Sequence, residues 1–260
     1  MRSLLPVVSL CVVLSTCCAF AADAQWNLVW HDNFDRDEVG PDWYVCGGKA
    51  SIEAGRLLLE GGGATIITER RFKADVRIEF DAEAHPGVPP CDLSATIGAN
   101  KDHGYGYLFA FGGRSNQANQ LLGLGVRQVD LEPPFVIEHG RVYRLVAQKE
   151  GRRLTYTVDG VKILDAETPD PVGGPGFDRV GMVTWTAMYA DNFRVYERAV
   201  PHPDTPDYPE SLPPTPLYRD GRLLRTKQGF VPSAGLAAAL DAFNQGRLED
   251  ALANFRGLGD

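Results

Sequence analysis

Three carboxylates recur at every second position of one short segment, at Glu79, Asp81 and Glu83. A β-strand sends alternate side chains to the same face, so an extended segment places all three carboxylates on one face. Paired carboxylates are the groups that hydrolyse glycosidic bonds, although a retaining pair lies about 5 to 5.5 Å apart. The outer two α-carbons here are about 13 Å apart at ~3.3 Å per residue. A solvated outer face has the same alternating pattern, and it is the competing interpretation.

A second segment carries an aromatic row that could stack on sugar rings, and a polar loop follows it. The competing interpretation is a buried core row, because Phe109 and Phe111 have no polar group to face water. The side chains of residues 114–120 suit hydrogen bonds to hydroxyl groups, or they form an ordinary solvated loop. The candidate sugar-binding residues of both segments are Tyr105, Tyr107, Arg114, Asn116, Asn119 and Gln120.

Three other aromatic residues are candidate stacking platforms, namely Trp43, Trp185 and Tyr189. Each is more often a core residue in a β-sandwich. Other chemistry has little support, because the five histidines lack zinc spacing. The sequence also contains no Gly-x-Ser-x-Gly motif and no phosphate-binding glycine loop.

The elements that must hold these residues are short strands. Between residues 26 and 198, turn signals recur at intervals of about 8 to 12 residues without a helical period. Asp159-Gly160 between β-rich runs is the clearest hairpin signal, since glycine readily adopts a positive φ. Residues 76–83 alternate apolar and charged side chains, which indicates one core face and one wet face. The pattern predicts an all-β, two-sheet sandwich over residues 25–198.

The composition changes sharply after the predicted sandwich. Residues 199–216 contain seven prolines and are interpreted as an extended, stiff linker. Residues 217–260 include one helical stretch, residues 235–258, predicted to form a short α-helical hairpin joined at Gly246. Residues 242–252 resemble the turn and second helix of a tetratricopeptide repeat. A single repeat cannot bury its own face, so this hairpin is a candidate docking element for a protein partner.

The overall charge limits the partners of the chain. Its 260 residues include 34 acidic and 26 basic side chains, for a formal net charge of −8. This balance argues against a general binder of nucleic acid or anionic membranes. After the N-terminal segment, no later run reaches the ~18 to 20 apolar residues that a membrane span needs.

The N-terminus is typical of an export signal. An apolar stretch over residues 4–20 precedes small residues at Ala22 and Ala24, which predicts cleavage after residue 24. The alternatives are an uncleaved anchor and a lipoprotein acylated at Cys17. The predicted location is therefore secreted or periplasmic, an oxidising compartment where Cys46 and Cys91 either form a disulfide or remain two unpaired, buried thiols.

Three stretches together resemble the concanavalin A-like lectin and glucanase superfamily. They are residues 30–43, residues 142–160 and residues 180–196, which include Trp30-His31-Asp32-Asn33-Phe34-Asp35, Val158-Asp159-Gly160 and Asp191-Asn192-Phe193. The resemblance is to secreted jelly rolls related to laminin-G-like domains and to a 3-keto-disaccharide hydrolase family. It implies a two-sheet antiparallel jelly roll over residues 26–198, a fold that hosts lectins, glycosidases, lyases and interaction domains alike.

The resemblance also implies site residues. Glu79-Phe80-Asp81-Ala82-Glu83 is similar to the catalytic strand of family sixteen glucanases, which makes Glu79 the nucleophile, Glu83 the acid/base and Asp81 a residue that tunes both. In the glucanases another strand precedes the catalytic one, and residues 72–83 look like that preceding strand. Jelly rolls often hold a structural calcium ion near their paired termini, which would involve Asp32, Asn33 and Asp191 or leave those side chains to ordinary strand-end hydrogen bonds.

Three functional hypotheses follow. The first is an exported jelly roll that binds carbohydrate without cleaving it, through the face of residues 105–111, the loop of residues 114–120 and Trp185. The second is a glycoside hydrolase of a polysaccharide or a modified disaccharide, using Glu79 and Glu83. The third is an interaction module without a sugar ligand, in which residues 217–260 capture a protein.

Overall fold

The computed structural model describes residues 26–101, 106–123, 129–131, 135–169 and 171–208, together with short stretches between residues 218 and 256. Regular structure up to residue 198 is almost entirely β-strand. The strands are β1 (Trp26–Asp32), β2 (Trp43–Glu53), β3 (Arg56–Thr68), β4 (Val76–Ala84), β5 (Leu93–Ala99), β6 (Tyr107–Gly112), β7 (Ala118–Gly123), β8 (Val129–Leu131), β9 (Val142–Glu150), β10 (Arg153–Val158), β11 (Val161–Glu167), β12 (Arg179–Thr184) and β13 (Ala187–Arg198).

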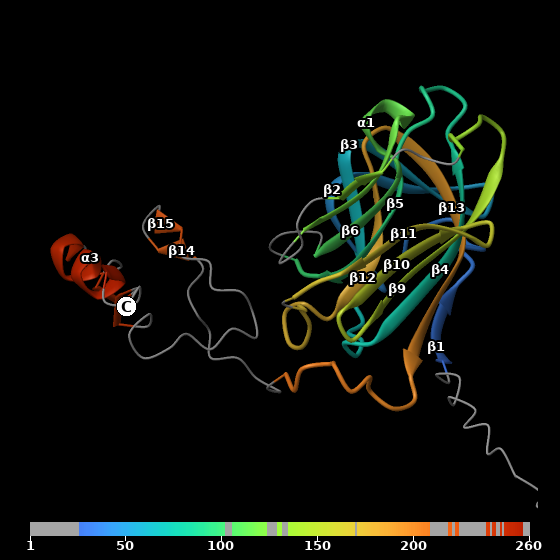
Figure 1. Ribbon diagram of the computed structural model, residues 1–260. Coiled ribbons are helices and arrows are strands. Elements are labelled where there is room, and N and C mark those ends of the chain that lie inside the picture. Colours follow the sequence, from blue (N-terminus) through green and yellow to red (C-terminus); the bar gives the residue numbers. More distant parts are fainter. Residues whose placement is uncertain are drawn as a thin grey trace, which may run out of the picture.

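The strands pair in one antiparallel path that folds into two layers (Figure 1). One layer follows the order β11-β10-β9-β4-β13, with β1 also paired to β13. The other follows β3-β12-β5-β6-β7-β8, with β2 also paired to β3. The layers are joined where β13 pairs with β3, and the buried apolar side chains of both form a single core cluster. The predicted all-β, two-sheet sandwich is confirmed.

The aromatic row on β6 lies inside this core. Tyr107, Phe109 and Phe111 are each 0% exposed. Their rings meet the opposite layer, with centroids 5.9 Å apart for Phe109 and Tyr156 and 5.2 Å apart for Phe111 and Tyr143. The interpretation of this row as a sugar-stacking surface is corrected for Tyr107, whose hydroxyl accepts a hydrogen bond from the Val172 N–H at 2.6 Å. Tyr105 lies outside the described residues.

The alternation predicted for β4 is present. Its apolar side chains are buried in the core, whereas Arg77, Glu79, Asp81 and Glu83 are only partly buried on the outer face. The Asp159-Gly160 hairpin is also found, and both residues have positive φ, 48° and 80°. Such values fit the tight two-residue turn that joins β10 to β11.

Cys46 and Cys91 are not bonded to each other, which corrects the disulfide prediction in favour of two free thiols. Cys46 lies on β2 and Cys91 just before β5, and β3 and β12 lie between these two strands in the sheet. Three inter-strand spacings of about 4.8 Å therefore separate the two positions by ~14 Å. The α-carbons of a disulfide lie within about 7 Å of each other.

Residues 199–208, which we call the strap, continue from β13 and are fastened to the sandwich. The buried carboxylate of Asp75 accepts hydrogen bonds from the N–H of His202 at 2.7 Å and from the hydroxyl of Thr205 at 2.6 Å. It also accepts one from the N–H of Gly151 at 2.8 Å. Nearby, the side chain of Lys149 is buried and donates to the Ala74 carbonyl at 3.0 Å. The first part of the predicted linker is thus held against the sandwich.

Two short strands follow among the described residues, β14 (Tyr218–Arg219) and β15 (Arg222–Leu223). Helical residues follow at positions 238–239 and 241–242 and in α3 (Leu248–Arg256). The resemblance of this region to a tetratricopeptide repeat stays a prediction, as do the domain boundaries. The predicted leader, residues 1–24, lies outside the described residues. None of the helices in the described part of the chain has the length and apolar character needed to cross a membrane.

Candidate functional site

The outer face of β4 is a row of carboxylates bound by arginines. Arg144 on β9 donates from Nη2 to Glu79 at 2.7 Å and from Nη1 to Asp81 at 3.1 Å. This contact follows from the strand register, since Arg144 lies opposite Asp81. Asp81 also accepts a hydrogen bond from the side-chain amide of Asn192 at 2.9 Å. The predicted wet face is therefore an ordered network of charges.

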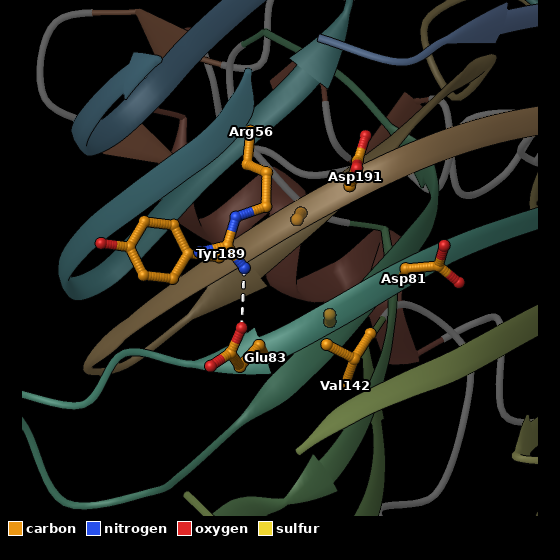
Figure 2. A pocket seen from close by; sticks show the side chains of 8 residues that line it. Arg56, Asp81, Glu83, Val142, Tyr189 and Asp191 are labelled. Carbon is orange, nitrogen blue, oxygen red and sulfur yellow. Dashed lines mark hydrogen bonds and ion pairs between the residues drawn. The ribbon is translucent and has the colours of Figure 1, made fainter. Parts of the chain in front are cut away.

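The same face continues to an arginine that lies over a tyrosine ring (Figure 2). Arg56 at the start of β3 donates to Glu83 at 2.7 Å, and its guanidinium carbon lies 4.1 Å from the centroid of the Tyr189 ring. The Tyr189 hydroxyl donates to Glu53 at 3.0 Å. Burial raises the pKa of Tyr189, and the hydrogen bond to Glu53 raises it further. These contacts hold the ring in a fixed place with part of its surface open to solvent.

A tight turn positions two of these partners. The hairpin between β2 and β3 turns at Ala54 and Gly55, which have φ values of 50° and 72°. This turn sets Glu53 and Arg56 opposite each other in the β2–β3 register. Tyr189 reaches them from β13, whose first residues pair with β3. Short-range turn geometry and long-range strand pairing together build the ring's surroundings.

A cavity of about 100 Å³ lies beside the Tyr189 ring. Figure 2 shows the side chains that line it, which come from β3, β4, β9 and β13 and include Arg56, Asp81, Glu83, Val142, Tyr189 and Asp191. Three of these side chains are carboxylates and one is a guanidinium. An aromatic ring, a small cavity and several converging polar groups are the usual components of a small-ligand site.

Asp191 differs from the other carboxylates of the cavity. Its only hydrogen bond within the described residues comes from the Asn192 N–H at 2.6 Å, and no arginine or lysine there is paired with it. Burial raises the pKa of Asp191, and the negative charges of Asp81 and Asp35 add to this rise, whereas the Asn192 N–H and the charge of Arg56 lower it. The cavity therefore contains one partly desolvated carboxylate that forms no ion pair with an arginine or lysine among the described residues.

The carboxylates of β4 lie on one face as predicted, but they are engaged separately. Glu79 is bound by Arg144 and Glu83 by Arg56. Their α-carbons are four residues of extended strand apart, about 13 Å, whereas a retaining pair needs carboxyls about 5 to 5.5 Å apart. This arrangement suits ligand binding better than glycosidic hydrolysis, in which an acid and a nucleophile act on the same bond. The catalytic roles of Glu79, Asp81 and Glu83 stay a prediction.

Most of the predicted polar loop serves the turn between β6 and β7, around the short α1 (Gly113–Asn116). Asn116 exchanges two hydrogen bonds of 2.9 Å with the backbone of Ile137. Asn119 is 0% exposed, and Gln120 is nearly buried at 9%. The interpretation of Asn119 and Gln120 as ligand-binding residues is therefore corrected, because these two side chains do not face solvent. Arg114 is exposed, with left-handed backbone angles of φ 50° and ψ 53°.

The three other aromatic candidates divide between core and surface. Trp43 is 6% exposed and donates from its indole nitrogen to Asp32 at 2.7 Å. Trp185 is 55% exposed, in the turn between β12 and β13. A β-carbon placed at Gly63 would lie 3.5 Å from the nearest atom of the Trp185 ring, so this ring lies beside Gly63. Trp185 and Tyr189 therefore remain as surface platforms.

The predicted calcium ligands are engaged by different partners. Both Asp32 oxygens are occupied by the Arg36 guanidinium, at 2.6 and 2.7 Å, in addition to the Trp43 indole. Asn33 donates to Asp35, and Asp191 lies opposite Asp81 on the β13–β4 ladder. The described residues contain no group of three or more His, Cys, Asp or Glu side chains placed to hold a metal ion. The calcium assignment is thereby corrected for Asp32, whose two oxygens are both engaged, and it stays a prediction for Asn33 and Asp191.

Comparisons with known proteins give matches in structure only. No family model matches the chain, and no curated protein matches it. Among solved structures, it is similar to the carbohydrate-binding module CBM66 from Bacillus subtilis, with 18% identity over 60% of this chain and 92% of that chain and a TM-score of 0.44. It is also similar to the catalytic domain of an endo-1,3-β-glucanase (laminarinase) from Thermotoga petrophila RKU-1, with 15% identity over 68% and 100% of the two chains and a TM-score of 0.47.

A third similar structure is β-agarase A from Zobellia galactanivorans, with 14% identity over 66% of this chain and 92% of that chain and a TM-score of 0.42. The identities, between 14% and 18%, limit these similarities to the fold.

Proposed function

We propose that this chain binds carbohydrate without cleaving it, at the site formed by Tyr189, Arg56 and the adjoining carboxylates. The observation that carries the proposal is the Tyr189 ring, which Arg56 and Glu53 hold beside a cavity lined by Asp81, Glu83 and Asp191. Arg56 lies over this ring and the His85 ring lies 5.3 Å from it, so the C–H groups of a pyranose meet the apolar surface that these two side chains leave open. The carboxylates accept hydrogen bonds from its hydroxyl groups, and the guanidinium donates to its oxygens.

Binding without cleavage is favoured by the partners of the carboxylates. Acid catalysis requires a carboxyl group that is free to deliver a proton to the glycosidic oxygen. Glu79 and Glu83 instead face guanidinium groups at 2.7 Å. The same contacts fix these side chains in single orientations, which lowers the entropy cost of binding a ligand against them. If the wild type hydrolyses a glycan that it binds, and Glu79→Gln abolishes this hydrolysis, the protein is a glycoside hydrolase and the proposal is wrong.

The experiment is a glycan array followed by calorimetry with the oligosaccharide retained most strongly. Tyr189→Ala should lower the affinity about tenfold or more, the order of magnitude for removing a buried aromatic anchor. Tyr189→Phe keeps the ring and should retain most of the affinity. The matched control is Tyr44→Ala, because Tyr44 is 36% exposed and has Lys101 Nζ 4.6 Å from its ring, but lines no described cavity.

The outcome separates a binding site from general destabilisation. Tyr44→Ala should leave the affinity unchanged. Equal losses for Tyr189→Ala and Tyr44→Ala, or a loss for Tyr189→Ala that follows a drop in melting temperature, would contradict the proposal. Trp185→Ala extends the test to the second exposed platform, and we expect a smaller loss there because no described carboxylate or arginine is bonded to it.

Export is part of the proposal. The apolar segment and the small residues at Ala22 and Ala24 support removal of residues 1–24 during secretion. Expression with the full leader in a bacterial host should give a processed chain that begins at Gln25, found outside the cytoplasm. An intact N-terminus on a cytoplasmic product would contradict this part.

A further inference from the structure

We propose that the sugar bound beside Tyr189 carries a positively charged amino group, and that Asp191 is the residue that binds this ammonium. The inference rests on the proposed function and deepens it, because it names the class of glycan that the site selects. The expected ligand is an amino sugar with a free amine, as opposed to a neutral, N-acetylated or acidic sugar.

The first argument is the charge of the cavity lining. Three carboxylates and one guanidinium line it, and the guanidinium of Arg56 is already bound to Glu83 and lies against the Tyr189 ring. Arg144 compensates part of the charge of Asp81 from the neighbouring strand. A ligand that enters the cavity therefore meets an excess of negative charge. Acidic sugars are disfavoured there by repulsion.

The second argument is that Asp191 forms no ion pair with an arginine or lysine in the part of the chain that the structure describes. Asp191 and Asp81 are directly opposite each other in the β13–β4 register. Like charges at opposed positions of an antiparallel pair destabilise the sheet. Arg144 and Asn192 bind Asp81, so Asp191 is left with one backbone N–H and with the charge of Arg56, which is itself bound to Glu83. An ammonium group of a ligand would supply the missing partner.

The third argument is geometric. Tyr189 and Asp191 are two residues apart on the same face of β13, which is about 6.6 to 6.8 Å along a strand. A pyranose ring stacked on Tyr189 can thus place a ring substituent at Asp191. A metal ion is a poorer fit, because the described residues hold no group of three or more carboxylate, histidine or cysteine side chains around one point. A monovalent organic cation needs only one well-placed carboxylate.

The test compares two ligands that differ only in this charge. The tetramer of β-1,4-linked glucosamine and its fully N-acetylated counterpart are titrated against the protein by calorimetry at pH 6. We expect the wild type to bind the glucosamine tetramer about tenfold more tightly, as for a charge-assisted contact of about 1.4 kcal/mol. The preference should shrink as salt is added, because added ions screen a partly exposed charge pair.

The Asp191→Asn variant should lose this preference. Its affinity for the N-acetylated tetramer should stay within about twofold of the wild-type value, since only the charge at the site is removed. Asp207→Asn is the matched control, because Asp207 is an exposed carboxylate on the strap and does not line the Tyr189 cavity. It should leave both affinities unchanged.

The outcomes separate the inference from the proposed function. Equal affinity for the two tetramers, or a preference that persists in Asp191→Asn, overturns the assignment of the ammonium to Asp191. If Tyr189→Ala still weakens binding of another glycan in those cases, the proposed function stands. Absence of binding to every glycan on the array overturns both.

Discussion

In the sequence, the outer face of β4 and the aromatic row of β6 look equally suited to ligand binding. In the fold, the first is partly exposed and the second is buried. The carboxylates of β4 face outward and are bound by arginines from neighbouring strands. The rings of β6 face the core and contact the other layer. Strand β4 has one open face, whereas all six residues of β6 are buried. Alternation assigns side chains to two faces, and the place of the strand within the sandwich decides whether either face reaches solvent.

The largest expected effect on stability comes from removing a ring of β6 that faces the core. Phe109→Ala should lower the free energy of unfolding by about 3 to 5 kcal/mol, because it removes a fully buried ring and leaves a cavity between the layers. The measurement is urea unfolding followed by fluorescence and circular dichroism. The control is Tyr196→Ala, which removes a partly buried ring from the outer face of β13.

Tyr196→Ala should cost much less stability than Phe109→Ala. If Phe109→Ala does not fold, Phe109→Leu keeps the comparison measurable, and it should still be less stable than the wild type. Equal effects for the inner and the outer ring would show that β6 does not form the core between the layers.

The second expected effect concerns a charge on the inward face. Lys149 continues the buried row of β9 and is 1% exposed, at the end of the sandwich that the strap covers. Burial lowers the pKa of Lys149 from an ordinary value of 10.5 to about 8. Between these two pH values the unfolded chain binds more protons than the folded chain, so the contribution of Lys149 to stability rises with pH. The total rise is at most about 3 kcal/mol at 1.36 kcal/mol per pKa unit.

Lys149→Met should remove this rise. The comparison is the free energy of unfolding of wild type and variant at several pH values from 7 to 10.5, with the difference between them plotted against pH. Lys162→Met is the control, since the Lys162 side chain is 47% exposed on β11 and should leave the wild-type profile intact. A Lys149→Met profile parallel to that of the wild type would mean that this lysine is not desolvated.

Local signals in the sequence predicted the sandwich, the strand faces of β4 and the Asp159-Gly160 turn, because period and turn chemistry depend on neighbouring residues. The binding site depends on contacts that no local signal carries. The glycine of the Ala54-Gly55 turn is a local hairpin signal, but Arg56, which follows it, reaches Glu83 and Tyr189 only through the pairing of β3 with β13 and of β13 with β4. Tyr189 is one of three aromatic candidates. Whether such a residue reaches solvent, as Tyr189 does, or is buried, as Trp43 is, depends on the position of its strand in the sandwich.

The same reasoning explains the corrected assignments. Asp32 looked like a calcium ligand by residue type, yet Arg36 four positions later occupies both of its oxygens. Asn119 and Gln120 have the polarity of a sugar-binding loop, but their strand, β7, is placed where its side chains are covered. Residue type predicts which bonds a side chain can form, whereas the partner that forms them is set by the fold.

The smallest expected effect on stability comes from removing an arginine that binds the carboxylates on the outer face of β4. Arg144→Met keeps the aliphatic stem of the side chain but removes the guanidinium that joins Glu79 to Asp81. Because Arg144 is about one-third exposed, the loss of unfolding free energy should be only about 0.5 to 1 kcal/mol. Binding of the glucosamine tetramer should change more than stability does, since Asp81 then adds its uncompensated charge to that of Asp191 and attracts the ammonium more strongly. A variant with unchanged binding but a stability loss as large as that of Phe109→Ala would place Arg144 in the structural framework and remove the arginine-bound carboxylates of β4 from the ligand site.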